Sequence, residues 1–186
     1  MTVHFEEAGP HNTDQTLETA QKAARERNIK HILVASTWGD TGVKAAKVFS
    51  DNPARVTIVS HNTGFNEEGV QQLEPDKAEQ IKKLGGQIYT GTMVLRGLGT
   101  AVRQRSGNYS EEQLIANTLR ILGQGIKVCV EISAMACDAG LVPPGDVIAI
   151  AGTGRGADTC AVIAANSSNR FFDIKVREIL AKPSNF

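Results

Sequence analysis

The chain has 186 residues, of which 41% are hydrophobic and 22% charged, and its 20 Lys and Arg residues balance its 20 Asp and Glu residues. A neutral chain of ordinary composition has no overall field that attracts a polyanion, so we expect no nucleic-acid partner. No apolar run approaches the roughly 20 residues that cross a bilayer, and residues 1–7 lack the basic and apolar parts of a signal peptide. We therefore expect a cytoplasmic protein without a membrane partner, and one domain over residues 1–186 because no linker divides them.

The cysteines give no sign of a disulfide or a metal site. Cys129 and Cys137 lie eight residues apart in an expected helix. That spacing is about 12 Å along the helix axis, which is too far for a disulfide. Cys160 makes the count odd, and no CxxC, HxH or HExxH spacing occurs. We expect no metal and treat the cysteines as small buried apolar residues.

The first half of the chain alternates between helical spacing and short apolar runs. Asn12 is expected to cap the first helix, Pro75 to begin the third, and Gly85 with Gly86 to end it. The expected helices cover residues 12–28, 43–51 and 75–84, and the expected buried strands cover residues 32–35, 55–59 and 88–90.

The second half begins with a long connection, Thr92 to Gly107, that has no clear period and carries three arginines. A connection of this length is typical of a functional or a mobile loop. Ser110 with Gln113 then predicts a capping box that opens a helix. We further expect a helix over 126–139, strands over 146–151 and 159–164, and either an edge strand or a short helix over 171–180.

Alternating helices and buried strands predict a three-layer α/β/α sandwich with a mostly parallel sheet and right-handed crossovers. The gap between the last two strands, 152–158, is too short for a crossover helix, so these strands should pair antiparallel. Open α/β sheets bind ligands at the carboxyl ends of their strands. The residues that follow the strands are therefore the candidate site.

The strongest local signal is a turn rich in glycine and hydroxyl groups between a buried strand and a helix. Free backbone N–H groups at a helix start, with the hydroxyls of Thr37 and Thr41, form a cradle suited to a phosphate. The alternative is a helix start capped by Asp40 or Thr41 without any ligand. The candidate binding residues in this turn are Ser36, Thr37, Trp38, Gly39, Asp40, Thr41 and Gly42.

A second glycine-rich loop follows the strand over 146–151, and its residues Gly152, Thr153 and Gly154 are also candidates. The run 152–157 fits the dinucleotide pattern G-x-G-x-x-G/A, but an expected strand rather than a helix follows it, so we reject a Rossmann site. Two interpretations remain open: a ligand-binding loop with one cation, Arg155, or a plain hairpin turn.

Small hydrogen-bonding residues also follow the second and third strands, and they add His61, Asn62, Gly64, Gly91 and Thr92 to the candidate site. His61 is either a proton donor or acceptor near neutral pH or a structural histidine.

Glu131 lies inside an apolar helix, where an unpaired carboxylate would be costly. Lys127, one turn earlier, is its simplest partner. A catalytic role for Glu131 is the alternative.

The run from Ile32 to Gly42 and the elements after it resemble the carboxyl-terminal domain of pyruvate kinase. Residues 125–132, 138–141 and 156–159 are similar to free-standing proteins of that fold. The resemblance covers nearly the whole chain but not the catalytic barrel of pyruvate kinase, so it implies no phosphoryl transfer to pyruvate. It implies a five-stranded sheet of order 3-2-1-4-5, with the fifth strand antiparallel and the two glycine-rich segments side by side.

The resemblance also implies flavin mononucleotide (FMN) as a cofactor, with its phosphate on the first turn. Trp38 departs from the family pattern, which has a small hydroxyl residue there; its indole either stacks on the flavin ring or blocks the phosphate. We expect binding of a small phosphorylated molecule, foremost FMN, with a redox role as one consequence.

Two other functions stay open at this point. One is a non-catalytic regulatory module that senses a phosphorylated metabolite, and the other is a hydrolase or lyase that uses His61 and the arginines of residues 92–107. The sequence does not decide whether the protein is an enzyme. As a protein partner we expect only further copies of the same chain, in a homo-oligomer.

Overall fold

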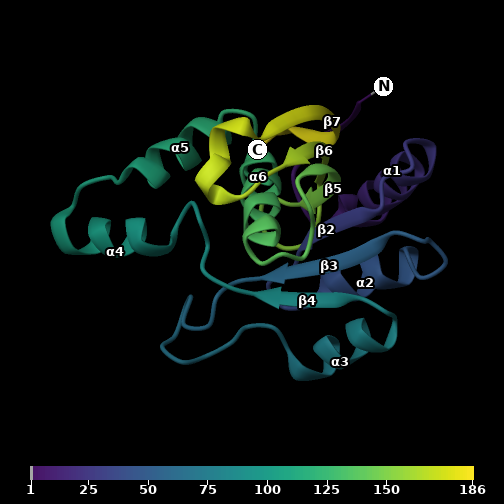
Figure 1. The fold of residues 1–186 in the computed structure, drawn as a ribbon, viewed down its shortest axis with the longest axis horizontal. Coiled ribbons are helices and arrows are strands. Elements are labelled where there is room, and N and C mark those ends of the chain that lie inside the picture. The colour runs from purple at the N-terminus through teal and green to yellow at the C-terminus, as the bar shows by residue number, and fades with distance from the viewer. Residues whose placement is uncertain (1) are drawn as a thin grey trace.

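The computed structural model describes residues 2–186, and its strands form one mixed sheet (Figure 1). The strands are β1 (Val3–Glu7), β2 (His31–Ala35), β3 (Arg55–Ser60), β4 (Gln87–Thr90), β5 (Gly145–Ala151), β6 (Thr159–Ala165) and β7 (Lys175–Asn185). Their order in the sheet is β1-β7-β6-β5-β2-β3-β4. Strands β4, β3, β2 and β5 run parallel, and β6 is antiparallel to both β5 and β7.

The five expected strands are all present as β2 to β6, and their expected order 3-2-1-4-5 is confirmed as β4-β3-β2-β5-β6. The antiparallel pairing across residues 152–158 is also confirmed. The expectation of five strands in all was wrong, because β7 pairs with β6 and β1 pairs with β7. In β1 only Phe5 is buried and Val3 is partly buried, so the alternation covers two apolar residues and is too short to identify a strand in the sequence.

Six α-helices and two short 3-10 helices complete the fold. They are η1 (Pro10–Asn12), α1 (Thr13–Glu26), α2 (Asp40–Val48), α3 (Pro75–Lys83), α4 (Gly97–Ser106), α5 (Glu111–Arg120), α6 (Gln124–Asp138) and η2 (Ser168–Asp173). Helices α1, α2 and α3 share one core with the sheet, into which Ile32 and Val34 of β2 point. Leu33 points into the opposite core with α6. The predicted three-layer sandwich is therefore confirmed.

Some local predictions were confirmed and others were not. Pro75 is the first residue of α3, and Gly85 beyond its end has a positive φ of 83°. Asn12 does not cap α1; its side chain instead donates to the carbonyl of Glu7 at 2.8 Å. Helix α5 begins directly after Ser110, but no side-chain hydrogen bond caps it.

The expected loop over 92–107 was wrong in its second half, because α4 occupies Gly97–Ser106. This helix buries only Gly99, so it lacks the apolar stripe that identifies a helix in a sequence. Residues 171–180, left open between helix and strand, divide between η2 and β7.

Helices α4 and α5 extend away from the sheet as an arm (Figure 1). Side chains on and beside these helices are exposed although they are large and apolar: Leu98, Val102, Tyr109, Leu114, Ile121 and Leu122. Exposed apolar groups of this kind are typical of contact surfaces. The expected homo-oligomer stays a prediction, and this arm is the surface to examine for it.

All three cysteines are free, and Cys129 and Cys137 both lie on α6 as predicted. Burial raises the pKa of the Cys160 thiol to about 12 and that of the Cys137 thiol to about 11, so both are protonated at neutral pH. Within residues 2–186 we find no helix with the length and apolar character needed to cross a membrane.

A buried carboxylate on α6 forms an ion pair within that helix and a hydrogen bond to the segment that leads into α4. Lys127 pairs with Glu131 as predicted, and their side chains are 3% and 1% exposed. The second oxygen of the carboxylate, Oε1, accepts the backbone N–H of Leu95 at 2.8 Å. The carboxylate of Glu131 is thus satisfied from two sides, and the start of the arm is fixed to α6.

We expect Lys127→Met to destabilise the protein by about 3–5 kcal/mol, because it leaves the carboxylate of Glu131 buried without its cation. The double variant Lys127→Met/Glu131→Gln should recover part of this loss, since the amide oxygen still accepts from Leu95 and no charge is left unpaired. Urea denaturation of the two variants and the wild type measures the difference. Equal loss in the single and the double variant would contradict this account.

Candidate functional site

The turn after β2 is shaped by one serine and one glycine. Ser36 Oγ accepts the backbone N–H of Gly42 at 3.0 Å, so Ser36 caps α2 in place of the expected Asp40 or Thr41. Gly39 has a φ of 101°, and a Cβ there would lie 2.7 Å from Cβ of Lys77. The turn therefore needs glycine for both its conformation and its packing. The first amides of α2, such as that of Thr41, are left free at the helix start.

Asp40 joins this turn to the loop after β5. Its Oδ1 lies 2.6 Å from Nζ of Lys77 and its Oδ2 lies 2.8 Å from a guanidinium nitrogen of Arg155. The hydrogen bond from Lys77 is the largest cause that lowers the pKa of Asp40 below 3.8. The carboxylate thus turns away from the helix start, and two cations balance its charge. The two glycine-rich segments lie side by side, as the sequence led us to expect.

The loop between β5 and β6 is organised by the buried carboxylate of Asp158. Its Oδ2 accepts the backbone N–H groups of Gly9 and Thr153, each at 3.1 Å, and its Oδ1 accepts the hydroxyl of Thr159 at 2.8 Å. A Cβ on Gly156 would lie 2.5 Å from Cα of Pro10. Close packing accounts for that glycine, so its presence is not by itself a sign of a ligand.

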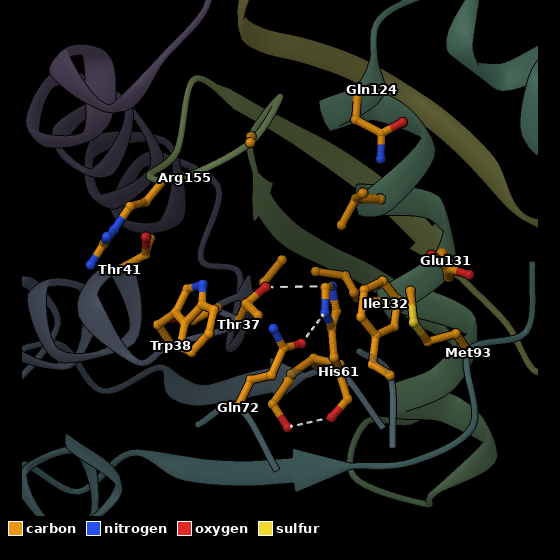
Figure 2. A pocket seen from close by; sticks show the side chains of 18 of the residues that line it. Thr37, Trp38, Thr41, His61, Gln72, Met93, Gln124, Glu131, Ile132 and Arg155 are labelled. Carbon is orange, nitrogen blue, oxygen red and sulfur yellow. Dashed lines mark hydrogen bonds between the residues drawn. The ribbon is translucent and has the colours of Figure 1, made fainter. Parts of the chain in front are cut away.

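A cavity of about 410 Å³ lies where these turns meet α6 (Figure 2). Its volume is in the range of small-molecule sites, roughly 300–1,000 Å³. The sequence-predicted residues that line it are Ser36, Thr37, Trp38, Asp40, Thr41, His61, Gly152, Thr153 and Gly154. Those that do not line it are Gly39, Gly42, Asn62, Gly64, Gly91 and Thr92. Trp38 is 43% exposed and leaves the cavity open.

One wall of the cavity was not predicted as a wall, although Glu131 had been considered as a catalytic residue and Lys127 as its partner. It is a face of α6 made of Gln124, Lys127, Val128, Glu131, Ile132 and Met135. These residues recur at intervals of three and four, so the helical period identifies them as one face once the helix is known. The helical period does not show that this face lies toward the ends of β2 and β3, because that depends on the topology of the chain. Phe65, Gln72, Met93 and Arg120 were also missed, and their sequence neighbours give no signal.

His61 is held in the cavity by three side chains (Figure 2). Its Nδ1 lies 3.1 Å from Oε1 of Gln72, and its Nε2 lies 3.4 Å from Oγ1 of Thr37. The ring of Phe65 stacks on the imidazole with the ring centres 3.9 Å apart, and Arg96 lies 4.5 Å from the centre of the Phe65 ring. Burial is the largest cause that lowers the pKa of His61 below 6.5.

The cavity carries a positive excess although the whole chain is neutral. Four cations line it, Arg96, Arg120, Lys127 and Arg155, against two carboxylates, Asp40 and Glu131. The described residues contain no cluster of three or more His, Cys, Asp or Glu side chains suited to a metal ion.

Strand β2 pairs with β3 on one side and with β5 on the other, and the cavity lies beyond its carboxyl end. The fold and the site therefore define an open α/β protein with a pocket at its topological switch point. The family model described as pyruvate kinase, alpha/beta domain matches residues 14–163, and the chain belongs to this family. The resemblance seen in the sequence is thereby confirmed.

Similar solved structures include a pyruvate kinase from Cryptosporidium parvum, with 16% identity, a TM-score of 0.42, and coverage of 83% of this chain and 23% of that one. The Cryptosporidium parvum pyruvate kinase in complex with ADP gives 17% identity, a TM-score of 0.41, and coverage of 83% and 24%. An O-ureido-L-serine synthase has 17% identity and a TM-score of 0.32, and the match covers 59% of this chain and 29% of that one. The chain thus spans about a quarter of the length of the pyruvate kinases that it matches.

The lowered pKa of His61 predicts a loss of stability on acidification. As the pH falls through 6.5, His61 is protonated in the unfolded chain before it is protonated in the folded protein. The free energy of unfolding should therefore decrease until the pH reaches the lower pKa of His61 in the folded protein. His61→Gln should flatten this decrease between about pH 8 and pH 5. Thermal denaturation across that range measures it.

His31 provides the matched comparison, because burial also lowers its pKa and it lies outside the cavity. His31→Gln should remove a separate part of the decrease. Asp40, with a pKa below 3.8, acts only in a more acidic range. An acid slope that is the same in His61→Gln and in the wild type would contradict the prediction.

Proposed function

We propose that this protein binds a small phosphorylated ligand in the cavity at the carboxyl edge of the sheet, and that FMN is the foremost candidate. The observation that carries the proposal is the excess of cations, four against two carboxylates, around a cavity of about 410 Å³ in a chain with no net charge. Cations concentrated at one concave site in a neutral protein favour an anionic ligand there.

The turn after β2 and Arg155 support a phosphate at one end of this cavity. The helix start offers free backbone N–H groups beside the hydroxyl of Thr41, and Asp40 is turned away onto Lys77 and Arg155. Helix N-termini bind phosphates through such amides and through the helix dipole. The side chain of Arg155 is 68% exposed, so its guanidinium has room to bind an anion while it keeps its ion pair with Asp40.

Apolar and aromatic side chains of the lining support a ring system at the other end. Phe65, Met93, Ile132 and Met135 all line the cavity, and so does Trp38 of the turn after β2, which is 43% exposed. Thioethers and aromatic rings are favourable contacts for a flat aromatic ligand. FMN, once bound, would supply redox chemistry, and Trp38 stacking on the flavin ring is part of the proposal.

The alternative function is a regulatory module that senses a phosphorylated metabolite without chemistry of its own. The same cations and helix start would bind a sugar phosphate, which needs no aromatic contacts. Thermal shift against a panel of sugar phosphates separates the two functions, because a ligand at 100 times its dissociation constant stabilises by about 2.7 kcal/mol.

We expect FMN to bind with quenching of its fluorescence and riboflavin, which lacks the phosphate, to bind more weakly. Arg155→Gln should weaken FMN binding by about 10- to 100-fold, which corresponds to a charged hydrogen bond of roughly 1.5–3 kcal/mol. It should leave riboflavin binding nearly unchanged. Fluorescence titration of both ligands gives the dissociation constants.

Arg105→Gln is the matched control, because Arg105 is an exposed arginine of α4 outside the cavity lining. A protein that quenches neither ligand would overturn the FMN proposal. Stabilisation by sugar phosphates without flavin binding would support the regulatory function instead.

A further inference from the structure

We propose that Thr37, His61 and Gln72 form a triad of nucleophile, base and orienting group that gives the cavity acyl-transfer activity toward esters of small anionic molecules. The three side chains are joined end to end, with Oγ1 of Thr37 at 3.4 Å from Nε2 of His61 and Oε1 of Gln72 at 3.1 Å from Nδ1 (Figure 2). A hydroxyl within reach of a base that a third group orients is the arrangement of activated hydroxyl nucleophiles.

The contacts of His61 fix both its orientation and its tautomer. The amide oxygen of Gln72 only accepts hydrogen bonds, so Nδ1 carries the proton and Nε2 presents its lone pair to the hydroxyl of Thr37. Gln72 is 8% exposed and Phe65 stacks on the ring, so the imidazole has little freedom to turn. Burial lowers the pKa of His61, which keeps it in the neutral form that a base needs.

The position of Thr37 in the fold suits a nucleophile. It lies on a sharp turn from strand β2 into helix α2, and the left-handed Gly39 makes that turn. In hydrolases with a strand–turn–helix nucleophile, the backbone N–H of the next residue stabilises the oxyanion. Here that residue is Trp38, whose N–H donates to no acceptor among the described residues. In the proposed mechanism this N–H is the donor that stabilises the oxyanion.

The reaction balances without any further reagent than water. Oγ1 of Thr37 bonds to the ester carbonyl carbon while its proton passes to Nε2 of His61. The bond from that carbon to the alcohol oxygen then breaks, and the leaving alcohol takes the proton from Nε2. Water attacks the acyl-threonine in the same way and returns the proton to Oγ1, which releases the carboxylic acid.

The class of substrate rests on the proposed anion-binding function of this cavity. Arg96, Arg120 and Arg155 line it and would hold a carboxylate or phosphate of the ester. The charged groups that act on His61 are Arg96, Lys127 and Glu131, and they belong to the same lining. An ester that carries a negative charge should therefore be preferred over a neutral one.

The test uses the purified full chain with two chromogenic esters, neutral 4-nitrophenyl acetate and anionic mono-4-nitrophenyl succinate. Thr37→Val keeps the shape of the side chain and should lower kcat/KM for both esters by about 100-fold or more. Thr37→Ser should retain turnover. Thr92→Val, which removes a hydroxyl outside the cavity, is the matched control and should match the wild type. Acid-quenched wild type should carry an acetyl group on the peptide that contains Thr37.

Gln72→Glu tests the orienting residue. A carboxylate at Nδ1 favours the charged imidazole and raises the pKa of His61, so the acid limb of the kcat/KM profile should move to higher pH. A purely structural role of Gln72 would change the amount of active protein but leave the profile in place.

The outcomes separate this inference from the proposed ligand. A wild type without turnover, or a Thr37→Val variant with full turnover, overturns the triad whatever the flavin titration shows. Turnover that depends on Thr37 but is equal for the two esters supports the triad and contradicts the anionic substrate class. A higher kcat/KM for the succinate ester that falls in Arg155→Gln supports both.

Discussion

The parallel pairing of β2 with β3 on one side and with β5 on the other is the constraint on which the cavity depends. The chain leaves β2 and β3 toward the face of α1 to α3, but it reaches β5 through α6 on the opposite face. The connections that follow β2 and β3 therefore lie on a different face of the sheet from the connection that leads into β5. Among the residues that the structure describes, no connection crosses the carboxyl end of β2, and a crevice is left there. Asp40, with Lys77 on one side and Arg155 on the other, then holds the two turns in place.

The order of the central strands could be predicted because the apolar runs, the lengths of the connections and the family resemblance all indicate the same sheet. Apolar runs such as Ile32–Val34 are buried on both faces, and the short gap over 152–158 excludes a crossover helix. Helix α4 and strand β1 escaped prediction for one physical reason. They bury a single residue each, Gly99 and Phe5, so the sequence has no repeated apolar spacing that would identify them.

The candidate site was predictable in part. The residues that directly follow β2 and β5 line the cavity because the carboxyl ends of parallel strands meet at one edge. Asn62, Gly64 and Thr92 follow strands as well, but the chain carries them past the cavity. The partner of His61 is Gln72, which comes from a loop with no regular spacing, so no sequence pattern reveals it. The wall contributed by α6 could be predicted only once the topology had placed this helix beside the ends of β2 and β3. The helical period then identifies which of its residues face the cavity.

The region that the family model matches begins at residue 14, yet residues before it hold the loop after β5, part of which lines the cavity. The hydroxyl of Thr13 accepts the backbone N–H of Ala157 at 3.0 Å, and the N–H of Gly9 shares the carboxylate of Asp158 with that of Thr153. These contacts act as a clasp on the loop after β5. A fragment trimmed to residues 14–163 would keep β2 to β5 whole and β6 up to Ile163, but it would lose the clasp. The region matched by the family model therefore leaves out residues that fix a loop beside the cavity.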